Sequence, residues 1–161
     1  APLIESIDFA RFGRAPARFD EAELALLGQK ILHHTDHEAV ADRLPAAITP
    51  ARWHAIRPNL MTVAEAADWV AVFDGPFVPP PADPADRPVI AAAVAAASGV
   101  DWSADPWHAL TGAVKEATGA KGRALFLPLR RALTGRDHGP DMGELLPLVA
   151  KDEAIARLSA A

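Results

Sequence analysis

Apolar residues recur at helical spacing in the first half of the chain. After Asp20, which is suited to cap a first turn, Leu24, Leu27 and Ile31 return every three or four residues, and the helix is expected to end near residue 34. Three further helices are predicted, each after a threonine suited to the N-cap position: 35–44, 49–57 and 62–73. Residues 1–19 show no sustained period, so we expect an extended arm there.

The stretch 75–88 interrupts this pattern. Six of its fourteen residues are proline, which fixes φ and lacks an amide donor, so neither a helix nor a central strand is expected there. Helical patterns then resume, and three of them end at a glycine. The predicted helices are 89–98, 105–118, 121–134, 141–149 and 151–159. Pro128 should kink the third of these or shift its start.

The predicted fold is therefore all-α, since no hairpin signal is present. Four segments organise the chain: an arm at 1–19, a first helical subdomain at 20–74, a proline-rich linker at 75–88 and a second helical subdomain at 89–161. A chain of 161 residues, half of them apolar, is long enough to bury a core.

Composition excludes several classes of protein. The sequence has no cysteine, which rules out disulfides, thiolate metal sites and thiol catalysis. The longest apolar run, 89–97, is far shorter than the roughly 20 residues of a membrane-spanning helix. Neither a membrane partner nor a secretory signal is indicated, and we expect a cytoplasmic protein.

Positive charge is concentrated in one part of an acidic protein. The net charge is -5, yet residues 111–140 hold six Lys or Arg against two acidic residues, a balance of 6 − 2 = +4. A basic stretch of this kind is typical of a protein that binds a polyanion, because neutralised phosphates release counterions. The alternative from charge alone is a solvated helix face.

No complete active site is visible in the sequence. The one cluster with metal-like spacing is His33, His34, Asp36 and His37. It lacks the glutamate of a zinc-protease motif and spans a predicted helix break, so structural histidines are expected. The four tryptophans stand at positions 53, 69, 102 and 107. We expect them in the core rather than as platforms for stacked bases.

One long stretch carries a specific resemblance. Residues 110–142 read LTGAVKEATGAKGRALFLPLRRALTGRDHGPDM, and this run closely resembles the C-terminal, anticodon-binding region of bacterial glutamyl-tRNA synthetases. The segments APARFD at 15–20, IRPNLMT at 56–62 and LLPLV at 145–149 agree with the same family in the same order. The resemblance covers nearly the whole chain.

The resemblance implies an all-α region of two helical subdomains that belongs to a larger enzyme. In the family, an N-terminal catalytic domain carries His-x-Gly-His and Lys-Met-Ser-Lys signatures, and neither occurs here. The parent would join glutamate to tRNA with ATP and Mg²⁺, whereas this chain would hold no catalytic residue, metal or cofactor of its own. Its partners would be glutamate tRNA and the covalently linked catalytic domain.

The resemblance also implies which residues contact the anticodon. Arg130 matches a family arginine at the anticodon, where a planar guanidinium pairs with a base edge or a phosphate. The turn 135–142 matches the loop that receives unstacked bases, and Asp141 begins a helix whose free amides are expected to bind a base or phosphate. Contact positions in this turn are Gly139, Pro140 and Met142, with Arg131, Arg136 and His138 as helpers.

A departure from the family pattern concerns specificity. Members that reject glutamine tRNA carry an arginine two residues after the position of Arg57, and this chain has Asn59 there. Asparagine lacks the charged fork and pairs with more than one base edge. The hypothesis is that the parent discriminates glutamate from glutamine tRNA less strictly, which makes glutamine tRNA a second partner.

Two other readings of the sequence stay open. One is a free-standing helical module that binds tRNA in trans. The other is a protein-interaction module whose basic stretch contacts an acidic partner or its own acidic half. Salt-titrated RNA binding separates them, since a phosphate-dominated complex weakens steeply with salt.

Overall fold

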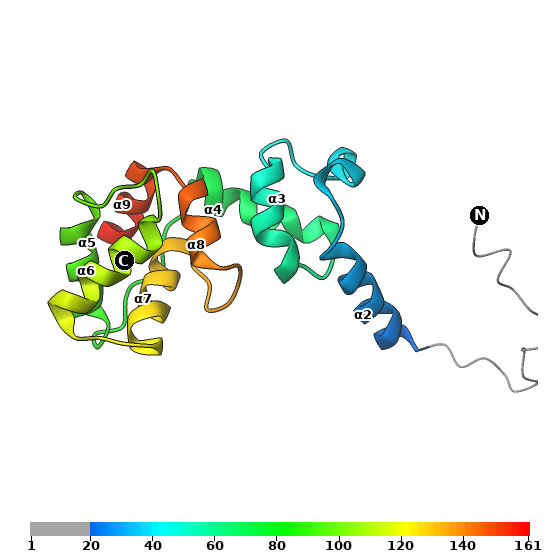
Figure 1. The fold of residues 1–161 in the computed structure, drawn as a ribbon. Coiled ribbons are helices and arrows are strands. Elements are labelled where there is room, and N and C mark those ends of the chain that lie inside the picture. The colour runs from blue at the N-terminus through cyan, green and yellow to red at the C-terminus, as the bar shows by residue number, and fades with distance from the viewer. Residues whose placement is uncertain (1–19) are drawn as a thin grey trace, which may run out of the picture.

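The structure, a computed structural model, describes residues 20–161, so the predicted arm at 1–19 lies outside the described residues. Every regular element within 20–161 is a helix, which confirms the all-α prediction. The array is elongated (Figure 1), with α2 (Glu21–Leu32) at one end. Packed at the other end are α5 (Arg87–Ala97), α6 (Pro106–Thr118) and α9 (Lys151–Ala160).

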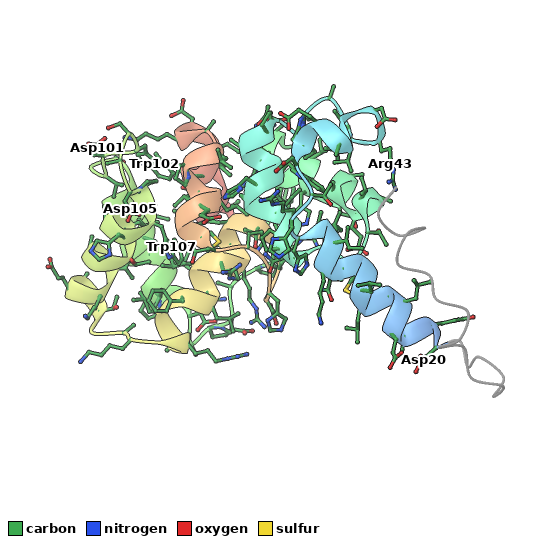
Figure 2. All side chains as sticks on the ribbon, turned by 45° about the vertical axis from the view of Figure 1, so that its right-hand side comes forward. Asp20, Arg43, Asp101, Trp102, Asp105 and Trp107 are labelled. Atoms are coloured by element: carbon green, nitrogen blue, oxygen red, sulfur yellow. The ribbon has the colours of Figure 1, made fainter. Side chains whose placement is uncertain are left out.

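Helix α2 begins where the sequence predicts. The Asp20 carboxylate accepts a hydrogen bond from the amide of Ala22 at 2.8 Å, so a purely local signal starts the helix. Its apolar face, however, does not join the core: Leu24, Leu27 and Ile31 are 54%, 53% and 61% exposed. The reason is that α2 projects away from the other helices, with Asp20 near its tip (Figures 1 and 2).

The helix predicted over 35–44 is wrong. Two short 3₁₀ turns stand in its place, η2 (His37–Ala39) and η3 (Ala41–Arg43). The Thr35 hydroxyl donates back to the Ile31 carbonyl at 2.8 Å and so caps no new helix. The His37 ring donates to the Ile48 carbonyl at 2.9 Å, which gives this histidine the structural role expected of it.

The next segment is partly as predicted. Helix α3 (Pro50–Ile56) starts at the Thr49 cap and is followed by η4 (Arg57–Asn59). The expected single α-helix over 62–73 is instead η5 (Val63–Trp69) followed by α4 (Val70–Asp74). Val63, Ala66 and Trp69 are buried at a spacing of three, because three residues complete a turn of 3₁₀ helix.

Beyond the proline-rich stretch the local signals are followed closely. Asp105 caps α6 by accepting from the His108 amide at 3.0 Å. Gly119 ends α6 and Gly135 ends α7 (Arg123–Thr134), both in the left-handed conformation predicted for a glycine after a helix. Pro128 lies inside α7 and is buried. Two short helices, α8 (Met142–Leu145) and η6 (Leu146–Leu148), precede α9.

The buried side chains form one continuous core that spans both halves of the chain. Arg157 of α9 is a central link in it, because its guanidinium donates to the Val72 carbonyl of α4 at 2.7 Å and to the Leu133 carbonyl of α7 at 2.9 Å. The proline-rich stretch forms no helix or strand up to residue 86, but its last two residues begin α5, which corrects the expectation of no helix over 75–88. Proline is tolerated in the first turn of a helix, where its missing N–H has no partner to lose. The stretch packs on the second half of the chain. Phe77 lies under the Arg157 guanidinium, 5.1 Å from its ring centroid.

An ion pair beside α3 gives the fold an acid-sensitive contact. Asp74 accepts two hydrogen bonds from Arg52, at 2.6 and 2.8 Å, and this bonding holds the pKa of Asp74 below its ordinary value of 3.8. A carboxylate with a lowered pKa stabilises the fold above its unfolded pKa, and that contribution is lost as pH falls through the folded pKa.

We therefore expect Asp74→Asn to reduce the loss of stability on acidification below about pH 4. Urea unfolding midpoints at neutral and acidic pH measure the effect. Asp42→Asn, at an exposed aspartate, serves as the control and should lose stability with acid as the wild type does. An Asp74→Asn variant with the full wild-type acid dependence would contradict this role.

Candidate nucleic-acid interface

The loop 135–141 joins α7 to α8 and is shaped by its two ends. Gly135 turns the chain out of α7, and the Thr134 hydroxyl accepts from the Arg136 amide at 3.2 Å. At the other end, Asp141 accepts from the amides of Gly143 and Glu144 at 2.7 and 3.3 Å. These two amides are thus already occupied, which corrects the expectation that they are free to bind a base or phosphate.

A cavity of about 340 Å³ separates this loop from η4 and η5. We call it the Trp69 groove. It is lined by Asn59, Leu60, Glu65, Asp68, Trp69, Arg136, His138 and Gly139. The groove brings together four residues singled out in the sequence, Asn59 from the first half and Arg136, His138 and Gly139 from the second, although 77 to 80 positions separate them along the chain.

Arg136 and Trp69 are stacked on one another in the lining of the groove. The Arg136 guanidinium lies 4.6 Å from the centroid of the Trp69 ring and donates to the Asp68 carbonyl at 3.1 Å. Such stacking on an aromatic face holds a guanidinium flat while its other N–H donors stay available. Within residues 20–161 no carboxylate lies within 4.0 Å of Arg136, so its charge has no ion-pair partner there.

Gly139 lets the loop lie directly on Trp69. Its φ of 150° is a conformation that L side chains rarely adopt, and a Cβ atom there would come within 2.7 Å of the Trp69 ring. The same Cβ would lie 3.5 Å from Nη1 of Arg130. Glycine at this position is therefore required by both backbone conformation and space.

Arg130 supports the loop from α7. Its Nη1 donates to the Pro140 carbonyl at 3.0 Å, and the side chain is partly buried. Burial lowers the pKa of Arg130 from its ordinary value, and the nearby Asp141 carboxylate opposes that shift. Arg130 also lacks an ion-pair partner within 4.0 Å among the described residues, so it adds positive charge next to the groove.

Five of the nine residues expected at the anticodon site do not line the groove. Arg130 and Pro140, joined by the hydrogen bond described above, lie beside it, and the other three are Arg57, Arg131 and Met142. Arg57 donates to the Thr35 carbonyl at 2.7 Å. Met142 is 1% exposed, so its side chain belongs to the core. Arg131 makes two hydrogen bonds to Asp137, at 2.6 and 2.8 Å, which raise the pKa of Arg131.

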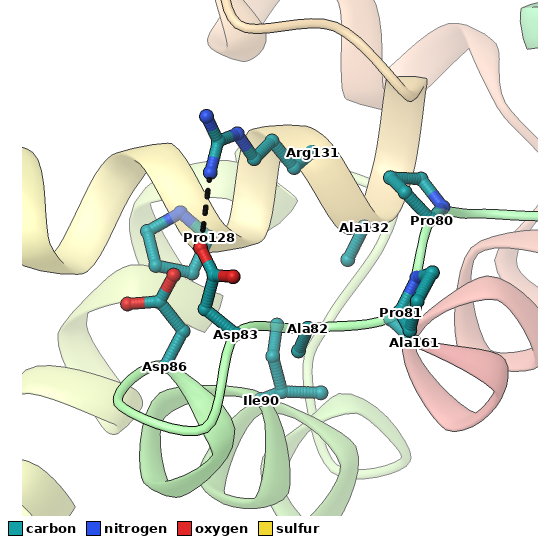
Figure 3. Close-up of a pocket in the computed structure, with 10 residues that line it drawn as sticks. All are labelled: Pro80, Pro81, Ala82, Asp83, Asp86, Ile90, Pro128, Arg131, Ala132 and Ala161. Carbon is teal, nitrogen blue, oxygen red and sulfur yellow. Dashed lines mark ion pairs between the residues drawn. The ribbon is translucent and has the colours of Figure 1, made fainter.

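Arg131 lines a separate cavity of about 120 Å³ between the proline-rich stretch and α5 and α7 (Figure 3). There its guanidinium lies 3.5 Å from the Asp83 carboxylate. Pro80, Pro81 and Ala82 form the adjoining wall. The geometry gives Arg131 an ion-paired, structural position.

The sequence missed four residues of the groove, Leu60, Glu65, Asp68 and Trp69. Trp69 was expected in the core, and it is 4% exposed, yet one face of its ring supports Arg136. Glu65 and Asp68 were not considered as site residues at all. No local pattern marks them, because they reach the groove only through the packing of η5 against a loop some 70 residues later.

The cluster of histidines has a structural role. His33 donates from its ring to the Leu60 carbonyl at 3.3 Å, and His37 is bonded as described above. Over residues 20–161 the structure contains no group of three or more His, Cys, Asp or Glu side chains that could hold a metal ion. The same residues include no helix that is both long and apolar enough to span a bilayer.

In comparisons with known proteins, one family model covers every residue of the described site. The family described as "Anticodon binding domain" matches residues 23–161. Glutamate–tRNA ligase 2 of Sphingopyxis alaskensis is 81% identical over 161 residues, which is 100% of this chain and 37% of that protein. Glutamate–tRNA ligase 1 of Novosphingobium aromaticivorans is 54% identical over 99% of this chain and 36% of its own length.

A solved structure shares the fold. The crystal structure of a glutamate tRNA ligase from Elizabethkingia meningosepticum, in complex with its amino acid, matches 98% of this chain and 35% of its own chain, with a TM-score of 0.75 at 21% identity. The chain thus spans a little over one third of the length of the curated relatives it matches.

Proposed function

We propose that this chain, which belongs to the anticodon-binding domain family, binds the anticodon arm of a tRNA through the Trp69 groove and Arg130. One observation carries the assignment of the site: two guanidinium groups without ion-pair partners among the described residues, Arg130 and Arg136, flank a cavity beside the 135–141 loop. Their donors suit phosphates and base edges, and Trp69 holds Arg136 in place.

The residues divide into direct and supporting roles in this proposal. Asn59, Arg136 and His138 would contact RNA from the walls of the groove, and Gly139 and Pro140 would shape the loop. Arg57, Arg131 and Met142 would hold the surrounding structure, because their side chains are engaged by the protein itself.

The longer relatives suggest what the bound tRNA is for. Since curated proteins that contain this region are glutamate–tRNA ligases, we propose that the chain is the anticodon-binding part of such a ligase. It would position glutamate tRNA for a catalytic domain N-terminal to it, which would use ATP and Mg²⁺ in the cytoplasm. A net charge of -5 favours modest affinity for RNA in isolation.

Binding measurements test the site. We expect Arg136→Ala and Arg130→Ala each to weaken binding of glutamate tRNA by about tenfold or more, because a hydrogen bond from a charged group contributes roughly 1.5–3 kcal/mol. Arg123→Ala, which removes the same charge from an exposed position at the start of α7, is the matched control. Fluorescence anisotropy at two salt concentrations, with an unrelated tRNA alongside, gives the affinities.

The outcomes separate the candidate functions. Salt-sensitive binding that prefers glutamate tRNA and depends on Arg130 and Arg136 supports anticodon reading. Equal losses in all three variants would mean that only overall charge matters, and the assigned site would be wrong. A chain that binds no tRNA but captures an acidic protein would favour the interaction module instead.

Asn59 bears on the choice between tRNAs. It is exposed and lines the Trp69 groove, so its amide is accessible to a base edge. We expect the full-length ligase to charge both glutamate and glutamine tRNA, and Asn59→Arg to narrow that choice toward glutamate tRNA. Steady-state charging assays with both transcripts check this. If the unmodified ligase charged glutamate tRNA but not glutamine tRNA, the hypothesis of relaxed discrimination would be wrong.

A further inference from the structure

Helix α2 is the one long helix whose apolar face is not covered by any other part of the described chain. Leu24, Leu27 and Ile31 lie on one side of it, at spacings of three and four residues, and each is more than half exposed. Single exposed apolar residues are common on protein surfaces, but an aligned row along one helix is typical of an interface. Of the residues in α2, only Leu32 is buried.

Gly28 belongs to the same face and supports the same interpretation. It stands in the interior of the helix, where glycine is less favourable than alanine, and no atom lies within 4 Å of the position its Cβ would take. A glycine on an apolar helix face permits another segment to approach the backbone closely. The described chain places nothing there.

We propose that the apolar face of α2 docks against the part of the longer ligase that lies outside these 161 residues. This inference rests on the proposed function. The relatives are nearly three times as long as this chain, so they contain ample further surface to cover such a row. Leu26, also 55% exposed, falls on the other side of α2 near Gln29 and Lys30, and so remains outside the docking face.

The far end of α2 is tied to the Trp69 groove. His33, which follows α2, bonds to the carbonyl of Leu60, a groove residue, at 3.3 Å. Two residues later, the Thr35 carbonyl accepts from Arg57 at 2.7 Å and from the Trp53 ring at 2.9 Å. Docking of α2 therefore fixes the orientation of the groove relative to the rest of the ligase.

Two charge substitutions test the docking face. Ile31→Glu places a carboxylate on it, and Leu26→Glu places the same group on the other side of α2. In the 161-residue chain, we expect both variants to keep the wild-type melting temperature and to remain monomeric. In the longer protein, Ile31→Glu should lower the melting temperature and speed amide exchange in α2, whereas Leu26→Glu should change neither. Charging activity should fall at least tenfold for Ile31→Glu alone.

Each contrary result identifies a different occupant and overturns the proposal. Loss of stability by Ile31→Glu in the 161-residue chain would mean that this chain covers the face itself. Concentration-dependent dimers of that chain, abolished by Ile31→Glu, would mean that a second copy covers it. Unchanged melting and exchange in the longer protein would mean that the face stays open. Failure of the proposed function is seen separately, as an unmodified longer protein that charges no tRNA.

Discussion

Arg157→Met is expected to lower the free energy of unfolding by about 3–5 kcal/mol, the cost typical of removing one partner of a buried charged network. The Arg157 side chain is 1% exposed, and three main-chain carbonyls and the Glu153 carboxylate accept its hydrogen bonds. Methionine would leave the Val72 and Leu133 carbonyls, which are unpaired at the ends of their helices, buried without a donor.

Equilibrium urea unfolding measures this loss. Arg157→Lys should recover only part of it, because an ammonium restores the charge near two helix C-termini but not the planar fork that reaches several carbonyls at once. Arg123→Met, at an exposed arginine, is the control and should change stability by less than about 0.5 kcal/mol. If Arg157→Met left the free energy of unfolding nearly unchanged, this guanidinium would not be what joins the two halves of the core.

The second large effect is expected at Gly139. Gly139→Ala would place a methyl group 2.7 Å from the buried Trp69 ring in a backbone conformation disfavoured for alanine. Overpacking of this kind lowers the free energy of unfolding by about 1–3 kcal/mol. The loop 135–141, which would have to move to relieve the contact, also lines the groove. We expect tRNA affinity to fall by about tenfold or more while the chain stays folded, as followed by anisotropy and far-UV circular dichroism.

Gly119→Ala is the matched control for this variant. Gly119 also has a positive φ, 71°, but no atom lies within 4 Å of its Cβ position. It therefore shares the backbone strain and lacks the contact with the groove, so its tRNA affinity should equal that of the wild type. Equal losses of affinity in both variants would show that Gly139 acts through general stability alone.

The elements that sequence predicts well are those with local signals. Asp20, Thr49 and Asp105 each cap the helix expected of them, and Gly119 and Gly135 end theirs. In each case the hydrogen bond or the backbone conformation involves residues within four positions along the chain, so neighbouring residue types determine the outcome.

The failures arise where distant contacts decide. The carbonyl of Thr35, where a helix was expected to begin, accepts hydrogen bonds from the side chains of Trp53 and Arg57, 18 and 22 residues later. The row of buried residues ending at Trp69 has the period of a 3₁₀ helix because of what it packs against. For the site, the family resemblance pointed to Arg130, Arg136 and Gly139, but not to Trp69 as their support. That contact joins η5 to a loop about 70 residues away, and no pattern in one sequence reports it.

We propose that bases of the anticodon enter the Trp69 groove. The most direct measurement is photocrosslinking of a glutamate tRNA that carries 4-thiouridine in its anticodon, with the attachment sites mapped by mass spectrometry. We expect crosslinks to the peptides around Asn59, Trp69 and residues 136–140, and we expect these crosslinks to be lost in Arg136→Ala. Crosslinks confined to α5 or α6, with none in the groove, would contradict it.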